Sequence, residues 1–166
     1  MRYAFGMGTA KSYLPEGVRS ITPHLTVKNS VEAIDFYGKA FGARVRSHAP
    51  GPAPGSTMHA DLQIGDSVLY LADEMPMSAT KAPGPGGSTV AMTLFVSDCD
   101  AVYKSAVDAG ARSLMPPADM FWGDRYSQVT DPFGHVWAIA THKEDVSPEE
   151  MERRAQEFFA RFAAGA

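Results

Sequence analysis

An internal repeat constrains this chain more than any other feature, because one pattern occurs twice with an offset of about 69 residues. The first copy runs through ITPHLTV and VEAIDFY to FGAR within residues 21–44. The second copy runs through AMTLFV and DAV to AGAR within residues 91–112. Each copy predicts a strand, a short turn, a helix that ends at a glycine, and a further strand. Such a unit cannot complete a sheet alone, so the two copies are expected to pair and to form a concave surface between them.

Length, composition and charge exclude several classes of protein. The 166 residues fit one domain or two small modules that share a core, and the hydrophobic content of 45% permits a sizeable core. The net charge is −4 and no more than two basic residues occur in a row, which argues against a nucleic-acid or anionic-membrane partner. The single cysteine, Cys99, excludes an internal disulfide and fits a reducing compartment. No segment has the length of a membrane span and the N-terminus lacks an apolar signal, so a soluble cytoplasmic protein is expected.

The order of predicted elements gives two similar modules. Alternation over residues 59–64 predicts a half-buried strand, and Gly65-Asp66 predicts the hairpin turn after it. DPFG at 131–134 predicts the corresponding turn in the second half. The predicted fold class is α+β, with two βαβββ modules that pair into a curved eight-stranded cup-like sheet, and an additional C-terminal helix. We expect an irregular N-terminal arm over 1–19, a first module over 20–80, a Pro/Gly linker over 81–88, a second module over 89–145, and the C-terminal amphipathic helix over 146–166.

The C-terminal helix has a clear start and an apolar face. Ser147 followed by Pro-Glu-Glu is typical of a helix N-terminus, with the serine as the cap. The residues expected on one face are Met151, Ala155, Phe158, Phe159 and Phe162. This face predicts docking onto the rest of the domain or onto a partner subunit, rather than onto a membrane surface.

Several motifs carry a resemblance to a known family. They are TPHLTV with AIDFY and AFGA in the first repeat, MHADLQIGDS at 58–67, and WGDRY with TDPFGHVW within 122–137. With these motifs in this order, the chain resembles the glyoxalase / bleomycin-resistance / extradiol-dioxygenase superfamily, the vicinal oxygen chelate proteins, and within it the PhnB-like branch. The resemblance implies paired βαβββ modules whose curved sheets form a cup, usually in a dimer. A homodimer is therefore expected.

The resemblance also allows the family's metal positions to be compared with this sequence. In metal-using relatives the ligands come from the first and fourth strands of each module and point into the cup. The matching positions here, with the fourth strands counted from Gly65 and Gly134, are His24, Leu69, Thr93 and Ala138. Catalytic metal sites usually have three protein ligands with carboxylate or imidazole donors. Only His24 provides one, so the usual metal site and any cofactor are expected to be absent.

A divalent metal remains possible through a different set of ligands. His59, Asp61 and Gln63 alternate with apolar residues, so they lie on one side of their strand. If that side faces the cup, His24, His59 and Asp61 converge, and His24 with His59 would be the metal ligands. The alternative is that this polar side is simply solvated.

Strand alternation also divides the other side chains between the helix side and the cup side of each sheet. The residues expected on the helix side are Leu25, Val27, Leu62, Ile64, Val68 and Trp137. The residues expected to line the cup are His24, Thr26, His59, Asp61, Thr93, Tyr126 and Gln128. A few polar groups among apolar walls are typical of a small-molecule site. An imidazole such as that of His24 is also a possible general base, although a hydrogen-bonded wall residue is the simpler interpretation.

Five further residues have two interpretations or an expected place. Trp122 belongs either to an aromatic lip of the cup or to packing under a long loop. Arg125 either holds an anionic ligand or forms a local ion pair. His135 and His142 are expected at the surface, because they lie on a hairpin and near a strand end. Cys99 is expected to be a packing residue, since no basic partner lies near it in sequence.

The residues lead to one main functional hypothesis and two others. The main one is a protein of the sequestration or resistance type, which binds a small molecule through His24, His59, Asp61, Thr93, Trp122, Arg125, Tyr126 and Gln128 without a catalytic metal. The second is a metal-dependent lyase, isomerase or dioxygenase that uses His24 as the catalytic residue together with a relocated ligand such as His59. The third is an interaction module whose partner docks on the C-terminal helix. The fold cannot choose among them, because one scaffold hosts many chemistries.

Overall fold

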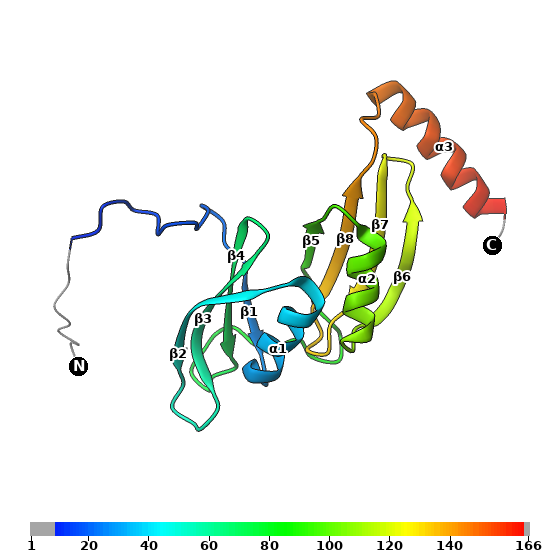
Figure 1. Ribbon diagram of the computed structural model, residues 1–166. Helices are drawn as coiled ribbons and strands as arrows, with labels where there is room; N and C mark the ends of the chain where they lie inside the picture. Colours follow the sequence, from blue (N-terminus) through cyan, green and yellow to red (C-terminus); the bar gives the residue numbers. More distant parts are fainter. Residues whose placement is uncertain (1–8, 165–166) are drawn as a thin grey trace.

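Each half of the chain forms the same four-stranded mixed sheet with a helix on one face. The computed structural model describes residues 9–164, and their side chains through Arg161 (Figure 1). The first half contains β1 (His24–Val27), α1 (Ser30–Phe41), β2 (Arg44–Pro50), β3 (Thr57–Ile64) and β4 (Ser67–Asp73). The second half contains β5 (Ala91–Phe95), α2 (Cys99–Asp108), β6 (Arg112–Asp119), β7 (Asp124–Thr130) and β8 (Val136–His142), and α3 (Pro148–Ala164) follows.

The strand order shows that the two halves are copies of one module. The first sheet has the order β1-β4-β3-β2 and the second has β5-β8-β7-β6. In each sheet the first strand pairs parallel with the fourth, and the remaining pairs are antiparallel. The predicted α+β class, with two βαβββ modules, eight strands and a C-terminal helix, is therefore confirmed. The eight strands are divided equally between two sheets.

Local sequence signals fix the ends of the helices. The side chain of Asn29 caps α1 by accepting a hydrogen bond from the backbone N–H of Glu32. Gly42 ends α1 with φ of 67°, a left-handed conformation that favours glycine. Asp98 caps α2 by accepting from the backbone N–H of Ala101. Helix α1 packs on β3 and β4 of its own sheet, and α2 packs on β6, β7 and β8.

The two modules meet through their helices. Figure 1 shows α1 beside α2 at the junction of the two sheets, and these helices are in direct contact. The ring of Phe41 in α1 lies 4.5 Å from that of Trp137 in β8, measured between centroids. The hydroxyl of Tyr37 donates to Asp131 Oδ2 at 2.7 Å, and Trp137 Nε1 donates to the same oxygen at 3.0 Å. Because the helices meet in the middle, each sheet turns its other face away from this junction.

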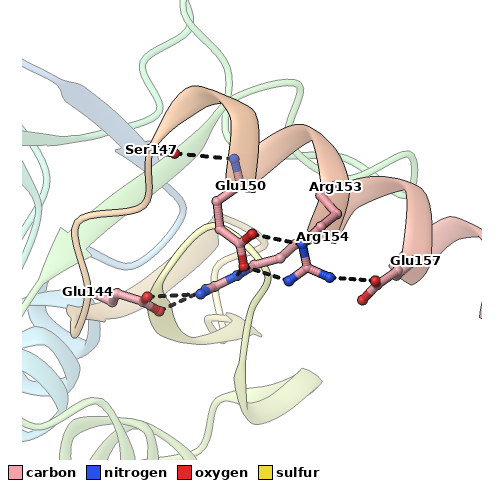
Figure 2. Close-up of polar contacts among 6 residues, drawn as sticks. All are labelled: Glu144, Ser147, Glu150, Arg153, Arg154 and Glu157. Carbon is pink, nitrogen blue, oxygen red and sulfur yellow. Dashed lines mark hydrogen bonds and ion pairs between the residues drawn. The ribbon is translucent and has the colours of Figure 1, made fainter.

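Helix α3 extends from the end of the second sheet (Figure 1), and ion pairs join it to the segment that connects it to β8 (Figure 2). The Ser147 hydroxyl accepts from the N–H of Glu150, which confirms the predicted cap. Arg154 donates to both carboxylate oxygens of Glu144, at 2.7 and 2.9 Å, and to Glu150 at 2.6 Å. None of the helices within residues 9–164 is long and apolar enough to cross a membrane.

The apolar face of α3 docks only in part onto the domain. The ring of Phe121, in the β6–β7 loop, lies 5.3 Å from Phe158 and 6.1 Å from Phe159. Phe159 nevertheless remains 61% exposed. The predicted contact of this face with the domain is thus present at Phe158 and Phe159, whereas the side chain of Phe162 lies outside the described residues.

Candidate functional site

A pocket of about 890 Å³ lies between the edge strands β1 and β5, where the two modules come together. His24 and Thr93, which occupy equivalent positions in the two repeats, both line it. Its apolar walls include Leu25, Ile64, Val68, Leu69, Met92, Leu94 and Trp137. Its size and its mixture of apolar walls with a few polar groups are those of a small-molecule site.

Backbone groups of both edge strands point toward this pocket. The carbonyls of Pro23 and Val27 accept hydrogen bonds from the fourth strand, so residues 23, 25 and 27 face β4. In a parallel pair, the intervening residues direct their N–H and C=O groups to the opposite side. His24 and Thr26 therefore present theirs at the free edge of β1. In the second sheet the N–H of Val96 donates to the carbonyl of Ala140 in β8. By the same alternation, the N–H and C=O groups of Thr93 lie at the free edge of β5.

His135 closes the junction at this edge and is not a surface residue. Its Nε2 lies 3.1 Å from the carbonyl oxygen of Thr26, and the side chain is only 6% exposed. Its backbone N–H donates to Asp131 Oδ1 at 2.9 Å. The expectation of a surface position was wrong, because the hairpin that carries His135 is covered by the other module.

The strand register shows that the β4 residue beside His24 on the cup side is Tyr70 and not Leu69. His24 pairs with Tyr70, and Leu69 pairs with Leu62 on the helix side. Counting from the hairpin glycine misplaced this position by one residue, because the β3–β4 turn has two residues whereas five separate β7 from β8. For the same reason Val68, which pairs with Gln63, lies on the cup side and not on the helix side as expected.

Four polar side chains gather on the cup side of the first sheet. His59 Nε2 lies 2.7 Å from Asp61 Oδ1. The ring centroid of Tyr70 is 4.8 Å from that of His59 and 6.1 Å from that of His24, and the two imidazoles are 5.9 Å apart. The expected convergence of His24, His59 and Asp61 is therefore present in the structure. Tyr70 was not predicted as a cup-side residue, although the two-residue length of the β3–β4 turn would have indicated its position.

The environment of His24 favours its neutral form. Partial burial lowers the pKa of His24 below its ordinary 6.5, and the positive charge that His59 acquires when protonated lowers it further. A neutral imidazole has one donor and one acceptor nitrogen. At neutral pH the His24 side chain is therefore uncharged and available for hydrogen bonding.

The residues at the family's four metal-ligand positions do not form a suitable metal site in this chain. With the corrected register, the four positions are His24, Tyr70, Thr93 and Ala138, of which only one is an imidazole and none is a carboxylate. Among the described side chains, no group of three or more His, Cys, Asp or Glu residues is arranged to hold a metal ion. The donor set is too poor for the usual site of a divalent metal.

The second sheet carries a separate group of predicted residues. Gln128 Nε2 donates to the hydroxyl of Tyr126 at 2.7 Å. The ring of Trp122 lies 5.4 Å from that of Tyr126, and its Nε1 donates to Asp124 at 3.0 Å. Tyr126 pairs with Ala140 of β8 and Gln128 with Ala138, so these side chains share the cup side of the second sheet.

Arg125 lies on the opposite side of β7 from Tyr126 and Gln128. Its Nε and Nη2 donate to the carboxylate of Asp100 at 2.9 and 2.8 Å, and Nη1 contacts Asp119 at 3.4 Å. Arg125 therefore forms an ion pair, but its main partner, Asp100, lies in α2 and not in the adjoining loop, and the structure does not bring Arg125 to the other candidate residues.

The remaining expectations on single residues concern His142 and Cys99. His142 is exposed, as expected, and hydrogen bonds to Asp124 and Asp145 raise its pKa above 6.5. Cys99 is buried, and burial raises the pKa of its thiol. Cys99 is thus a packing residue, as predicted.

Comparison with known proteins gives the same family as the sequence motifs. The family model described as Glyoxalase/Bleomycin resistance protein/Dioxygenase superfamily matches residues 18–139. An uncharacterised protein of Mycobacterium bovis, Mb0911c, is 39% identical over 137 residues, which cover 80% of this chain and 90% of the relative. The product of At5g48480 from Arabidopsis thaliana is 29% identical over 128 residues, 73% of this chain and 76% of the relative.

Solved structures show the same fold. The structure of the At5g48480 product has a TM-score of 0.62 at 28% identity and covers 74% of this chain and 98% of its own. TioX from Micromonospora has a TM-score of 0.60 at 27% identity, with 74% and 97% covered. The PhnB protein of Bacillus cereus, at 16% identity and a TM-score of 0.57 with 74% and 99% covered, shares the fold. The chain therefore belongs to the glyoxalase/bleomycin resistance protein/dioxygenase superfamily.

Proposed function

We propose that this protein binds a small organic molecule in the pocket between β1 and β5, without a catalytic metal, in the manner of sequestration or resistance proteins. The observation that carries the proposal is the pocket itself, which is lined from both modules and has a volume of about 890 Å³. Ligand sites of drug-sized molecules have volumes of about 300 to 1,000 Å³. His24 and Thr93 supply polar groups at its two edges, among mainly apolar walls.

The surface area of the chain supports a homodimer. The chain exposes 11060 Å², whereas a compact monomer of 17.8 kDa is expected to expose about 8,000 Å². The extended segment before β1 and the projecting helix α3 contribute part of this difference of about 3,000 Å² (Figure 1), which is larger than the roughly 800 Å² that one partner contributes to a standard interface. The face of each sheet opposite its helix is the natural contact, because it is large and turned away from the module junction. In such a dimer a second copy would cover the group formed by His24, His59, Asp61 and Tyr70, or the group on the second sheet.

A thermal-shift screen of small aromatic and aliphatic compounds tests ligand binding. A ligand present at 100 times its Kd stabilises the folded state by about 2.7 kcal/mol, which raises Tm by several degrees. Thr93→Trp should abolish the shift, since it fills the pocket from the exposed side of β5. Ser113→Trp, on the exposed part of β6, is the matched control. A shift that persists in Thr93→Trp would place binding elsewhere, and a broad screen without any shift would refute the proposal.

A metal-dependent enzyme is the second candidate, favoured by the bond between His59 and Asp61. A carboxylate that holds one imidazole nitrogen orients the other toward a metal, and Asp61 holds Nε2 of His59. His24 and His59 would hold the ion, which would polarise an oxygen of the substrate. Calorimetric titration of chelator-stripped protein with Mn²⁺, Fe²⁺, Ni²⁺ and Zn²⁺, with His24→Ala in parallel, decides between the candidates. Stoichiometric sub-micromolar binding that is lost in His24→Ala would establish the metal protein and overturn the first proposal.

A further inference from the structure

We propose that the ligand of the pocket is an amphipathic anion, an apolar molecule with one acidic group such as a carboxylate or sulfonate, whose charge is held by Arg19 and Lys81. This inference rests on the proposed function and specifies its ligand class. It follows from the distribution of charge around the pocket, which is opposite in sign to that of the whole chain.

The charged residues that line the pocket all have the same sign. Arg19 and Lys81 are among its lining residues, which include neither an aspartate nor a glutamate. The whole chain has 19 acidic and 15 basic residues and a net charge of −4. A pocket whose charged lining residues are all cations attracts anions.

The partners of the two cations leave most of this charge available. Lys81 Nζ lies 3.5 Å from Glu74 Oε1, a long and half-exposed ion pair, and Glu74 also accepts from the N–H of Ala82. Glu74 itself does not line the pocket. The guanidinium of Arg19 is exposed and forms no ion pair with any side chain in the part of the chain that the structure describes.

The interior of the pocket suits the remainder of such a molecule. Leu25, Leu69, Met92 and Leu94 offer apolar surface from both modules, which fits a hydrophobic body. The outward backbone groups of His24 and Thr93 add hydrogen-bond donors at the strand edges, where an acidic oxygen can accept. The charge of the ligand is therefore held at the rim, while its apolar part lies between the edge strands.

Two fluorescent probes with one aromatic body test this assignment. 1-Anilinonaphthalene-8-sulfonate carries a sulfonate, and N-phenyl-1-naphthylamine is its neutral counterpart. Both are titrated into the full-length protein, into Arg19→Glu/Lys81→Glu, and into Lys39→Glu/Lys104→Glu. The last variant has the same change in net charge, but its lysines lie on exposed helix surfaces where each pairs with an aspartate of its own helix. Thr93→Trp shows whether each probe occupies the pocket.

The two rim cations should determine the affinity for the sulfonate alone. Reversal of both charges is expected to weaken binding of the sulfonate probe about tenfold, because each exposed ion pair contributes up to about fivefold and its reversal adds repulsion. Binding of the neutral probe should stay the same, and the control variant should resemble wild type with both probes. Raising the salt concentration should weaken only the sulfonate probe.

The other outcomes separate this inference from the proposed function. If Thr93→Trp weakens binding of both probes, but Arg19→Glu/Lys81→Glu changes the affinity for neither, the assignment of an anionic ligand is overturned. The pocket then remains a binding site. If neither probe binds there, because a second copy or the chain itself fills the space, the proposed function fails and this inference fails with it.

Discussion

Replacing Tyr37 by phenylalanine is the sharpest test of how the two modules are held together. The Tyr37 hydroxyl in α1 donates to the carboxylate of Asp131 in the second module at 2.7 Å, and Tyr37 is fully buried. The same carboxylate accepts from Trp137 Nε1 and from the backbone N–H groups of Phe133 and His135. Phenylalanine removes one of these four bonds and leaves the ring packing in place.

The magnitude follows from the charge of the acceptor. A hydrogen bond to a buried charged group contributes about 1.5 to 3 kcal/mol, so Tyr37→Phe should lower the free energy of unfolding by about 2 kcal/mol. For a chain of this length that corresponds to a decrease in Tm of about 4 to 8 °C. Urea unfolding followed by circular dichroism, at equal protein concentrations, gives the difference directly.

The control is Tyr103→Phe, which removes a hydroxyl that donates to Ser113 at an exposed position. A neutral exposed bond contributes little, so this variant should lose less than about 1 kcal/mol. A loss in Tyr37→Phe no larger than that in Tyr103→Phe would refute the assignment of Asp131 as the polar link between modules.

The pH dependence gives a second measure of the same bond. Burial first, and then the charge of Asp131, raise the pKa of Tyr37 well above 10. The stability that this neutral hydroxyl contributes is complete below pH 10 and is lost as the pH rises, because only the unfolded tyrosine ionises there. The difference between wild type and Tyr37→Phe should therefore narrow above pH 10. A constant difference up to pH 11 would contradict the buried environment.

Three further predictions concern the titration of two histidines, the replacement of a glycine, and metal binding. NMR titration should give His24 a pKa below 6.5, so the stability contributed by its neutral form is lost as the pH falls. The pKa of His142 should lie above 6.5, so the stability contributed by its charged form is lost as the pH rises. Asp124→Asn should return His142 toward 6.5, and an unchanged value would contradict the bond between them. Gly123→Ala should lower Tm by at least about 3 °C, measured by calorimetry, because a Cβ would lie 2.2 Å from the Glu144 carbonyl at a φ of +97°; Gly65→Ala, with open space, should cost less. Wild-type protein stripped of metal should show no stoichiometric heat with Zn²⁺, whereas saturable binding would favour the enzyme.

The periodicity of the sequence was sufficient to assign most of the cup-side residues to the correct face of their strands. Alternation over β3 placed His59 and Asp61 on one side, and the structure joins them at 2.7 Å. The same reasoning failed at Val68 and Leu69, because a count along a strand depends on the length of the turn before it. A slip of one residue exchanges the two faces of a strand.

Contacts between segments far apart in the sequence could not be predicted from local patterns. His135 looked like a hairpin residue, yet it is buried against the Thr26 carbonyl of a strand 109 positions earlier. The ion pair of Arg125 with Asp100 likewise depends on where α2 begins relative to β7. Nothing in either neighbourhood of the sequence signals these partners.

The sequence by itself determined the repeat, the order of strands and helices and the polar side of most strands, because these depend on neighbours along the chain. Only the tertiary structure decided that the modules meet helix to helix, and that β1 and β5 face a common pocket. Those features arise from the packing of Tyr37, Phe41 and Trp137 and from the shared carboxylate of Asp131. They are contacts between distant segments, whose geometry is fixed by how two apolar surfaces fit together and not by any local pattern.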